Sequence, residues 1–140
     1  MIRKPCVLFL CTHNSARSQM AEGFTRALKA DAIEVYSAGI EAHGVNPHAV
    51  TAMREVGMDI SAQKSKTTNE LPDIDFDYVI TVCDNARETC PLFLRAGTMV
   101  HVGFDDPAAA TGSEEQIMAV FRRVRDEVRA FVEQMPGNLG

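Results

Sequence analysis

The chain has 140 residues and a formal net charge of −5. This length suits one domain, residues 1–140, that buries about two-thirds of its unfolded surface. The acidic balance argues against nucleic acid or an anionic membrane as the main partner. We also expect a monomer. The first apolar run ends at Leu10, too early for the core of a secretory signal, so we expect a cytoplasmic protein.

Four short apolar runs predict strands, because a strand covered on both faces is apolar throughout. They span residues 6–10, 33–36, 78–82 and 99–102. Helical patterns lie between them, at residues 18–29 and at residues 47–56, where Asn46 is the expected N-cap and Gly57 the expected end. This alternation predicts an α/β fold with about four parallel strands and helices on both faces of the sheet.

The last helix has the clearest local signal. Ser113 and Gln116 have the spacing of a capping box, in which each side chain bonds the other residue's backbone N–H. Apolar residues then recur at helical spacing and predict a stripe that packs on the sheet: Ile117, Phe121, Val124, Val128 and Phe131. We interpret the arginines on the other faces of this helix as solvated charge: Arg122, Arg125 and Arg129.

A cysteine, a short polar loop and an arginine connect the first strand to the first helix. After Cys11, the predicted oxyanion-binding residues are Thr12, His13, Asn14, Ser15, Ala16, Arg17 and Ser18. Loop N–H groups and the positive end of the helix dipole can converge on one anion there. The same field stabilises a thiolate, so Cys11 is the predicted nucleophile. Arg17 can grip two oxygens of the anion, and Ser18 can donate its hydroxyl to the cysteine sulfur.

Several other residues are ambiguous on their own. Cys6 lies inside the first apolar run and is predicted to be a buried core residue. Cys83 and Cys90 could equally end a strand and pack in the core, and Asp106 before a proline is an ordinary turn opener. The remaining histidines show no metal-ligand spacing with the cysteines, so we assign no metal: His43, His48 and His101.

Three segments together resemble a known family. They are residues 11–18, residues 82–91, which hold Cys83 and Cys90, and residues 103–107, which hold Asp106. The sequence resembles the thioredoxin-coupled arsenate reductases, which are built on the low-molecular-weight tyrosine phosphatase fold. Residues 36–44 and 56–61 are also similar to that family, so the likeness covers nearly the whole chain.

The resemblance implies a mechanism and its residues. Cys11 attacks arsenate to form a thiol-arsenate adduct, and Asp106 is the general acid for the departing oxygen. Cys83 then attacks Cys11, and arsenite leaves as the Cys11–Cys83 disulfide forms. Cys90 next attacks Cys83, and reduced thioredoxin reopens the resulting Cys83–Cys90 disulfide. The implied electron source is thioredoxin, with no bound cofactor.

The sequence departs from the family pattern at two positions. Members often hold a potassium ion below the oxyanion loop through residues that match Asn14, Glu22 and Ser37, together with an aspartate. Lys66 stands where we place that aspartate, and an ammonium repels a nearby cation, so we expect Lys66 to replace the ion. His13 replaces a smaller loop residue, and we expect its ring to point into solvent.

Two other functions remain open. A tyrosine or small-molecule phosphatase would need only Cys11, Arg17 and Asp106, acting through a cysteinyl-phosphate. It has no use for Cys83 and Cys90, and alanines follow Asp106-Pro107 where phosphatases often carry aromatic residues. A non-enzymatic anion sensor would use the loop only to bind, and would need neither a nucleophilic cysteine nor a proton donor.

Overall fold

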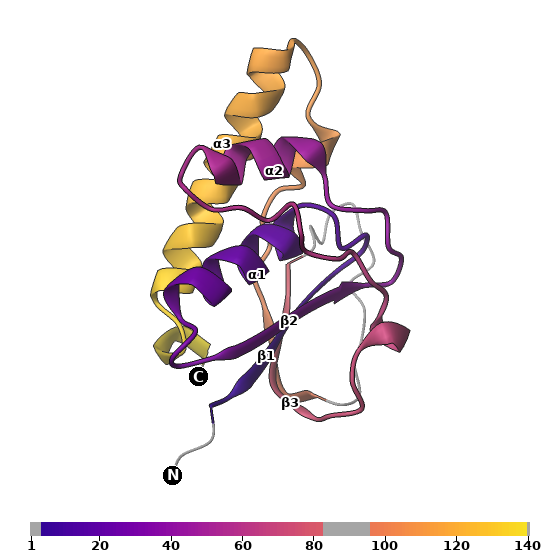
Figure 1. Ribbon diagram of the computed structural model, residues 1–140, viewed down its shortest axis with the longest axis vertical. Helices are drawn as coiled ribbons and strands as arrows, with labels where there is room; N and C mark the ends of the chain where they lie inside the picture. The colour runs from indigo at the N-terminus through magenta and orange to yellow at the C-terminus, as the bar shows by residue number, and fades with distance from the viewer. Residues whose placement is uncertain (1–3, 83–95, 140) are drawn as a thin grey trace.

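A four-stranded parallel sheet forms the centre of the molecule (Figure 1). The computed structural model describes residues 4–82 and 96–139. The strands are β1 (Cys6–Cys11), β2 (Glu34–Gly39), β3 (Phe76–Thr81) and β4 (Ala96–His101), in the spatial order β2-β1-β3-β4. Each neighbouring pair is parallel, so the carboxyl ends of all four strands lie at one edge. The predicted α/β fold with four parallel strands is confirmed.

Strand β1 is buried along its whole length, as its continuous apolar sequence predicts. Side chains alternate across a strand, so β1 contributes to two separate cores. Val7, Phe9 and Cys11 belong to the larger core, whereas Cys6, Leu8 and Leu10 belong to the smaller one on the opposite face. Cys6 is therefore a core residue, as the sequence predicts. The position of Cys11 at the end of β1 places its sulfur at the carboxyl edge of the sheet.

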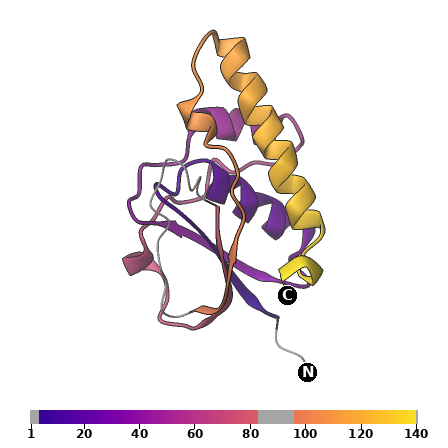
Figure 2. The same ribbon diagram turned by 180° about the vertical axis from the view of Figure 1, so that it is seen from behind.

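The described α-helices are α1 (Arg17–Leu28), α2 (Pro47–Arg54) and α3 (Glu114–Glu133). All three contribute to the larger core, and Figure 2 shows α3 running beside α1 and α2. The smaller core is closed by Leu71 and Ile74, which follow the short 3-10 helix η1 (Thr68–Glu70). The sequence predicts helices on both faces of the sheet. Within residues 4–82 and 96–139, the three α-helices pack on the face that carries the larger core. None of the described helices combines the length and apolarity that a membrane span requires.

The helix ends follow the local sequence signals. The Asn46 side chain accepts hydrogen bonds from the backbone N–H groups of His48 and Ala49 at the start of α2. Gly57, just beyond this helix, has the left-handed φ of +81° that favours glycine. At α3, both bonds of the predicted capping box between Ser113 and Gln116 are present. These ends depend on nearby residues alone, which explains why the sequence predicts them well.

The sequence predicts that the apolar stripe of α3 packs on the sheet, whereas its main neighbours are other helices. Its buried residues are Met118, Phe121, Val124, Val128 and Val132, and its main contacts are with α1, α2 and the short 3-10 helix η2 (Pro107–Ala109). Arg125 is not solvated charge: its side chain is about 10% exposed and donates to the carbonyl oxygen of Ala52 at 3.0 Å. It also pairs with Glu55 at 3.1 Å, because α2 packs directly over this turn of α3. The prediction for Arg125 is therefore wrong.

Candidate active site

The Cys11 sulfur lies below the loop that joins β1 to α1. Ser18 Oγ is 2.9 Å from Cys11 Sγ, and the backbone N–H of Asn14 donates to the same sulfur at 3.1 Å. These two contacts fix the position of the buried sulfur. The contact with Ser18 is the one that the sequence predicts. A cysteine sulfur held in this way at the carboxyl edge of the sheet suits a nucleophile.

Asn14 fixes the shape of this loop from within. Its φ of +48° lies in the left-handed region, which asparagine tolerates better than most residues. Its side-chain amide donates to Ser18 Oγ at 2.9 Å and to Ser37 Oγ at 3.1 Å. Its side-chain oxygen accepts from Gln19 at 2.9 Å and from the backbone N–H of Lys66 at 2.8 Å. Asn14 is fully buried, so it supports the loop and does not itself contact a ligand in the pocket.

A buried carboxylate lies one layer further down. Glu22 on α1 is about 5% exposed and accepts a hydrogen bond from Ser37 on β2. Its charge is compensated by Arg26, at 2.7 Å, and by the Lys66 ammonium, at 4.0 Å. Such pairing is expected, because a buried charge without a partner is very costly. Lys66 therefore brings its positive charge to the layer below the oxyanion loop, next to the carboxylate.

A small pocket opens above the loop at the carboxyl edge of the sheet. Its volume is about 120 Å³, and it is lined by Cys11, His13, Ser15, Ala16, Arg17, His43, Asp106 and Ala108. The first turn of α1 faces it without a side-chain cap or an acidic residue. The partial positive charge of an uncapped helix start favours an anion. The pocket therefore suits a small oxyanion held beside the Cys11 sulfur.

Arg17 and Asp106 meet in this pocket although they are far apart in the sequence. The Arg17 guanidinium is 3.7 Å from the Asp106 carboxylate, and it also donates to the carbonyl oxygens of Val82, at 3.2 Å, and Phe104, at 3.4 Å. These carbonyl contacts orient the guanidinium inside the protein. Asp106 accepts from the backbone N–H of Ala108 and so caps the helix η2. Its carboxylate is thus held at the pocket by a turn that the Asp-Pro sequence favours.

A second loop, residues 40–46, forms one rim of the pocket. Its backbone N–H groups donate to carbonyl oxygens of the oxyanion loop: Glu41 to Thr12 at 2.9 Å, and His43 to His13 at 3.2 Å. The two loops approach closely because residue 39, at the end of β2, is a glycine. A Cβ on Gly39 would lie 2.7 Å from the Glu41 carbonyl oxygen and 2.8 Å from the Asn14 nitrogen. No ordinary side chain fits there.

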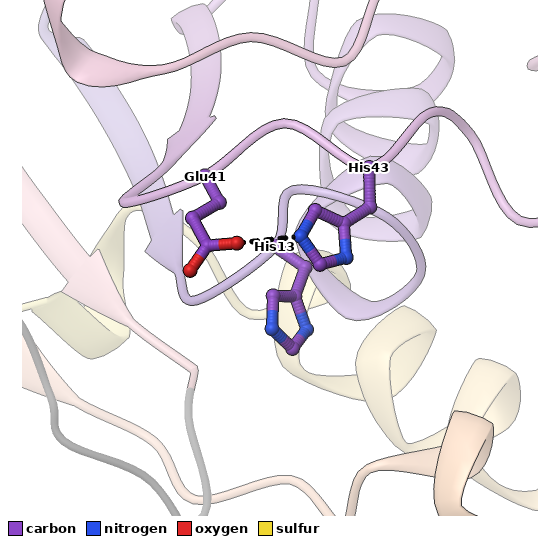
Figure 3. A group of neighbouring side chains, drawn as sticks. All are labelled: His13, Glu41 and His43. Carbon is purple, nitrogen blue, oxygen red and sulfur yellow. Dashed lines mark hydrogen bonds and ion pairs between the residues drawn. The ribbon is translucent and has the colours of Figure 1, made fainter.

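Three ionisable side chains gather on this rim (Figure 3). The rings of His13 and His43 are stacked, with their centroids 4.2 Å apart. His43 Nε2 is 2.7 Å from Glu41 Oε1, and this contact lowers the pKa of the Glu41 carboxyl below its ordinary value. The predicted solvent-facing ring of His13 is wrong, because the ring is half-buried and lines the pocket. The rim cluster was missed because its members meet only through the contact between the two loops.

The predicted site residues are therefore placed at different depths. Cys11, His13, Ser15, Ala16, Arg17 and Asp106 line the pocket. Asn14 and Ser18 are buried beneath it, while Thr12 gives its carbonyl oxygen to the rim loop. Cys83 and Cys90 lie outside the described residues. Gln19 and Ser37, which bond Asn14 from either side, had no motif that singled them out.

Comparison with known proteins gives the family. The model of the low molecular weight phosphotyrosine protein phosphatase family matches residues 6–139. The chain therefore belongs to this family. An arsenate reductase of Halalkalibacterium halodurans is 53% identical over 127 residues, covering 91% of each chain. Within the phosphatase family, the chain thus belongs with the arsenate reductases.

Solved structures agree with this grouping. An arsenate reductase described as being in the phosphate binding state matches with a TM-score of 0.78 and 35% identity, covering 97% of this chain and 99% of that one. A thioredoxin-dependent arsenate reductase of Corynebacterium glutamicum matches with a TM-score of 0.64 and 25% identity. It covers 96% of this chain, which spans 63% of the length of that protein.

Proposed function

We propose that this protein reduces arsenate to arsenite by a relay of three cysteines and that thioredoxin recycles it. The observation that carries the proposal is one small pocket lined by Cys11, Arg17 and Asp106. These residues supply a nucleophile, an oxyanion clamp and a proton donor. The curated relatives at about half identity are arsenate reductases, which supports arsenate as the substrate.

In the first step, the Cys11 thiolate attacks arsenic(V) and an As–O bond breaks. Asp106 gives the departing oxygen a proton, so water leaves and a thiol-arsenate adduct remains. The donors that hold the sulfur, Ser18 and the Asn14 N–H, keep it aimed at the pocket. Arg17 stabilises the negative charge on the arsenate oxygens, a role for which its planar fork is suited.

In the second step, the Cys83 thiolate attacks Cys11 Sγ. The S–As electron pair passes to arsenic, which leaves as arsenite, while the two sulfurs form a disulfide. Cys90 then attacks Cys83 and frees the Cys11 thiolate, and the thioredoxin dithiol reduces the Cys83–Cys90 pair. The position of Val82 supports this route: it is the residue before Cys83, and its carbonyl accepts from Arg17 at 3.2 Å. Val82, the last described residue before Cys83, thus lies beside Arg17 of the substrate pocket.

The alternative is phosphate ester hydrolysis through a Cys11 phosphoenzyme. The pocket chemistry allows it, since the same loop binds any tetrahedral oxyanion. Ala108 on the pocket wall offers no aromatic surface to grip a phosphotyrosine ring. We therefore expect phosphatase activity to be weak.

One assay separates these functions. Arsenite release would be measured with thioredoxin, thioredoxin reductase and NADPH, beside phosphate release from a chromogenic aryl phosphate. We expect sustained arsenite release, weak ester hydrolysis, and loss of both activities in Cys11→Ser. Efficient ester hydrolysis without arsenite release would identify a phosphatase. Binding of arsenate without either reaction would identify an anion sensor.

We also propose that the enzyme needs no bound potassium. An ion below the loop would have to share the Glu22 carboxylate with Arg26 and with the Lys66 ammonium, which lies 4.0 Å from it. Two cations already balance this single buried carboxylate, and a third would be repelled. Electrons come from thioredoxin, and the proposed chemistry requires no cofactor on the protein.

A further inference from the structure

The proposed reaction assigns no bond-breaking or proton-transfer step to the rim cluster of His13, Glu41 and His43. Each residue offers one nitrogen or oxygen atom that can bind a metal ion, and these three atoms lie within 4.8 Å of one another. Two imidazoles and one carboxylate are a donor set that zinc and neighbouring transition metals accept. The three side chains come from two loops: Glu41 faces His43, and the His13 ring lies against the His43 ring (Figure 3).

The backbone beneath these side chains is firmly held. The hydrogen bonds from the Glu41 N–H to Thr12 and from the His43 N–H to His13 join the two loops directly below the cluster. Because Gly39 lets the loops approach, the spacing of the three backbone positions is set by the fold. Only side-chain torsions remain to be adjusted when an ion binds.

Binding an ion requires two side-chain adjustments. A tetrahedral ion with bonds of about 2.0–2.1 Å spaces its ligand atoms about 3.3 Å apart. His43 Nε2 and Glu41 Oε1 are 2.7 Å apart, so this pair must open by a little over half an ångström. The His13 ring, stacked at an interplanar angle of 16°, must turn so that a nitrogen faces the ion. His43 and Glu41 are 48% and 61% exposed, which leaves their side chains free to move.

We propose that His13, Glu41 and His43 form a binding site for a divalent transition-metal ion of the zinc class. The protein supplies three ligands, and the fourth position is open to water. Since His13 and His43 also line the substrate pocket, the ion lies at the pocket mouth. This assignment rests on the rim geometry and stands whether or not the cysteine relay is correct.

Thiolates are the main competitors for such an ion, so the test must separate them. Co²⁺ is a suitable probe because thiolate ligation adds an intense sulfur-to-metal charge-transfer band, whereas nitrogen and oxygen ligands give only d–d bands. The full chain carrying Cys11→Ser, Cys83→Ser and Cys90→Ser leaves Cys6 alone, buried in β1. Circular dichroism checks its fold. If it does not fold, the titration is run on the wild-type chain and the d–d component is analysed separately.

We expect one equivalent of Co²⁺ to bind without a charge-transfer band and to be displaced by Zn²⁺. His43→Ala and Glu41→Gln should each lower the affinity at least tenfold, because each removes one of three protein ligands. The matched control is His48→Ala, which removes a different histidine–glutamate pair, 2.8 Å from Glu114, and should change the affinity less than twofold. Absence of binding would overturn the site. So would an affinity that His43→Ala and Glu41→Gln leave unchanged.

Discussion

Asn14 shows how much of this site depends on a single residue that never touches the pocket. Its side chain bonds Ser18 and Ser37, and it accepts from Gln19 and the Lys66 backbone. Because the residue is fully buried, water cannot replace these partners. A buried polar network therefore shapes the loop that holds the nucleophile. The same network fixes the positions of the loop residues that line the pocket.

We predict that Asn14→Ala lowers the free energy of unfolding by at least about 2 kcal/mol. The variant removes all the hydrogen bonds of a buried side chain and takes the acceptor from the Lys66 N–H, and a buried polar group that loses its partner costs about 1–3 kcal/mol. Urea denaturation measures the change. Asn46→Ala is the comparison, since it removes only the N-cap of α2 and should cost about 1 kcal/mol. Equal costs for the two variants would contradict the role assigned to Asn14.

The contact between the oxyanion loop and residues 40–46 positions the site together with the sheet. Residues 40–46 bond the oxyanion loop through their backbone, and Gly39 is the point at which they meet. The loops thereby fix the rim, the nucleophile and the start of α1 relative to one another.

Gly39→Ala should disturb this contact. The added Cβ would lie within 3.0 Å of three backbone atoms, which cannot move without shifting both loops. Overpacking of this kind costs about 1–3 kcal/mol, and we also expect a higher KM for arsenate. Denaturation and steady-state kinetics provide the two readouts. Gly137→Ala is the control, because nothing lies within 4 Å of its added Cβ. If Gly39→Ala kept the wild-type stability and KM, the two loops could move apart without affecting the site.

The ion-pair cluster between α2 and α3 predicts a pH dependence. Hydrogen bonds from Arg122 and the charges of Arg122 and Arg125 lower the pKa of Glu55 below its ordinary value of 4.5. A carboxyl whose pKa is lower in the folded state stabilises the protein above its unfolded pKa. That stability is lost as the pH falls through the folded pKa. The exposed position of Glu55 and screening by salt make the effect modest.

The difference in stability between wild type and Glu55→Gln should therefore be larger at neutral pH than at about pH 3. Urea denaturation at the two pH values measures it. A difference for Glu55→Gln that does not depend on pH would mean that this cluster contributes nothing through its charges.

Across the whole molecule, the sequence correctly predicts the features that depend on local or continuous patterns of residues. The four strands, the caps at Asn46 and Ser113, and the nucleophile loop all have signals within a few residues. The rest depends on contacts across the fold. The burial of Arg125 depends on α2 packing over α3, and the rim cluster depends on Gly39 bringing residue 13 beside residues 41 and 43. No pattern of charge or hydropathy along the chain contains that information.

The charge balance below the loop predicts how the whole protein responds to monovalent cations. With Lys66 about 19% exposed and 4.0 Å from Glu22, thermal stability should be the same in sodium and potassium at equal ionic strength. Lys66→Met should lower the melting temperature, because Glu22 loses one of its two cations. Lys64→Met is the matched control, since Lys64 is 77% exposed and pairs with Glu70. Selective stabilisation of the wild type by potassium would contradict the proposal that Lys66 replaces the ion.

In the proposed relay, Cys83 and not Cys90 is the first thiol to attack Cys11. The most direct measurement is one turnover of Cys90→Ser with arsenate and no thioredoxin, followed by alkylation and peptide mass mapping. We expect one arsenite released per protein and a trapped Cys11–Cys83 disulfide, with no such disulfide in Cys83→Ser. A Cys90→Ser protein that releases arsenite repeatedly, or that leaves Cys11 and Cys83 as free thiols after the turnover, would contradict it.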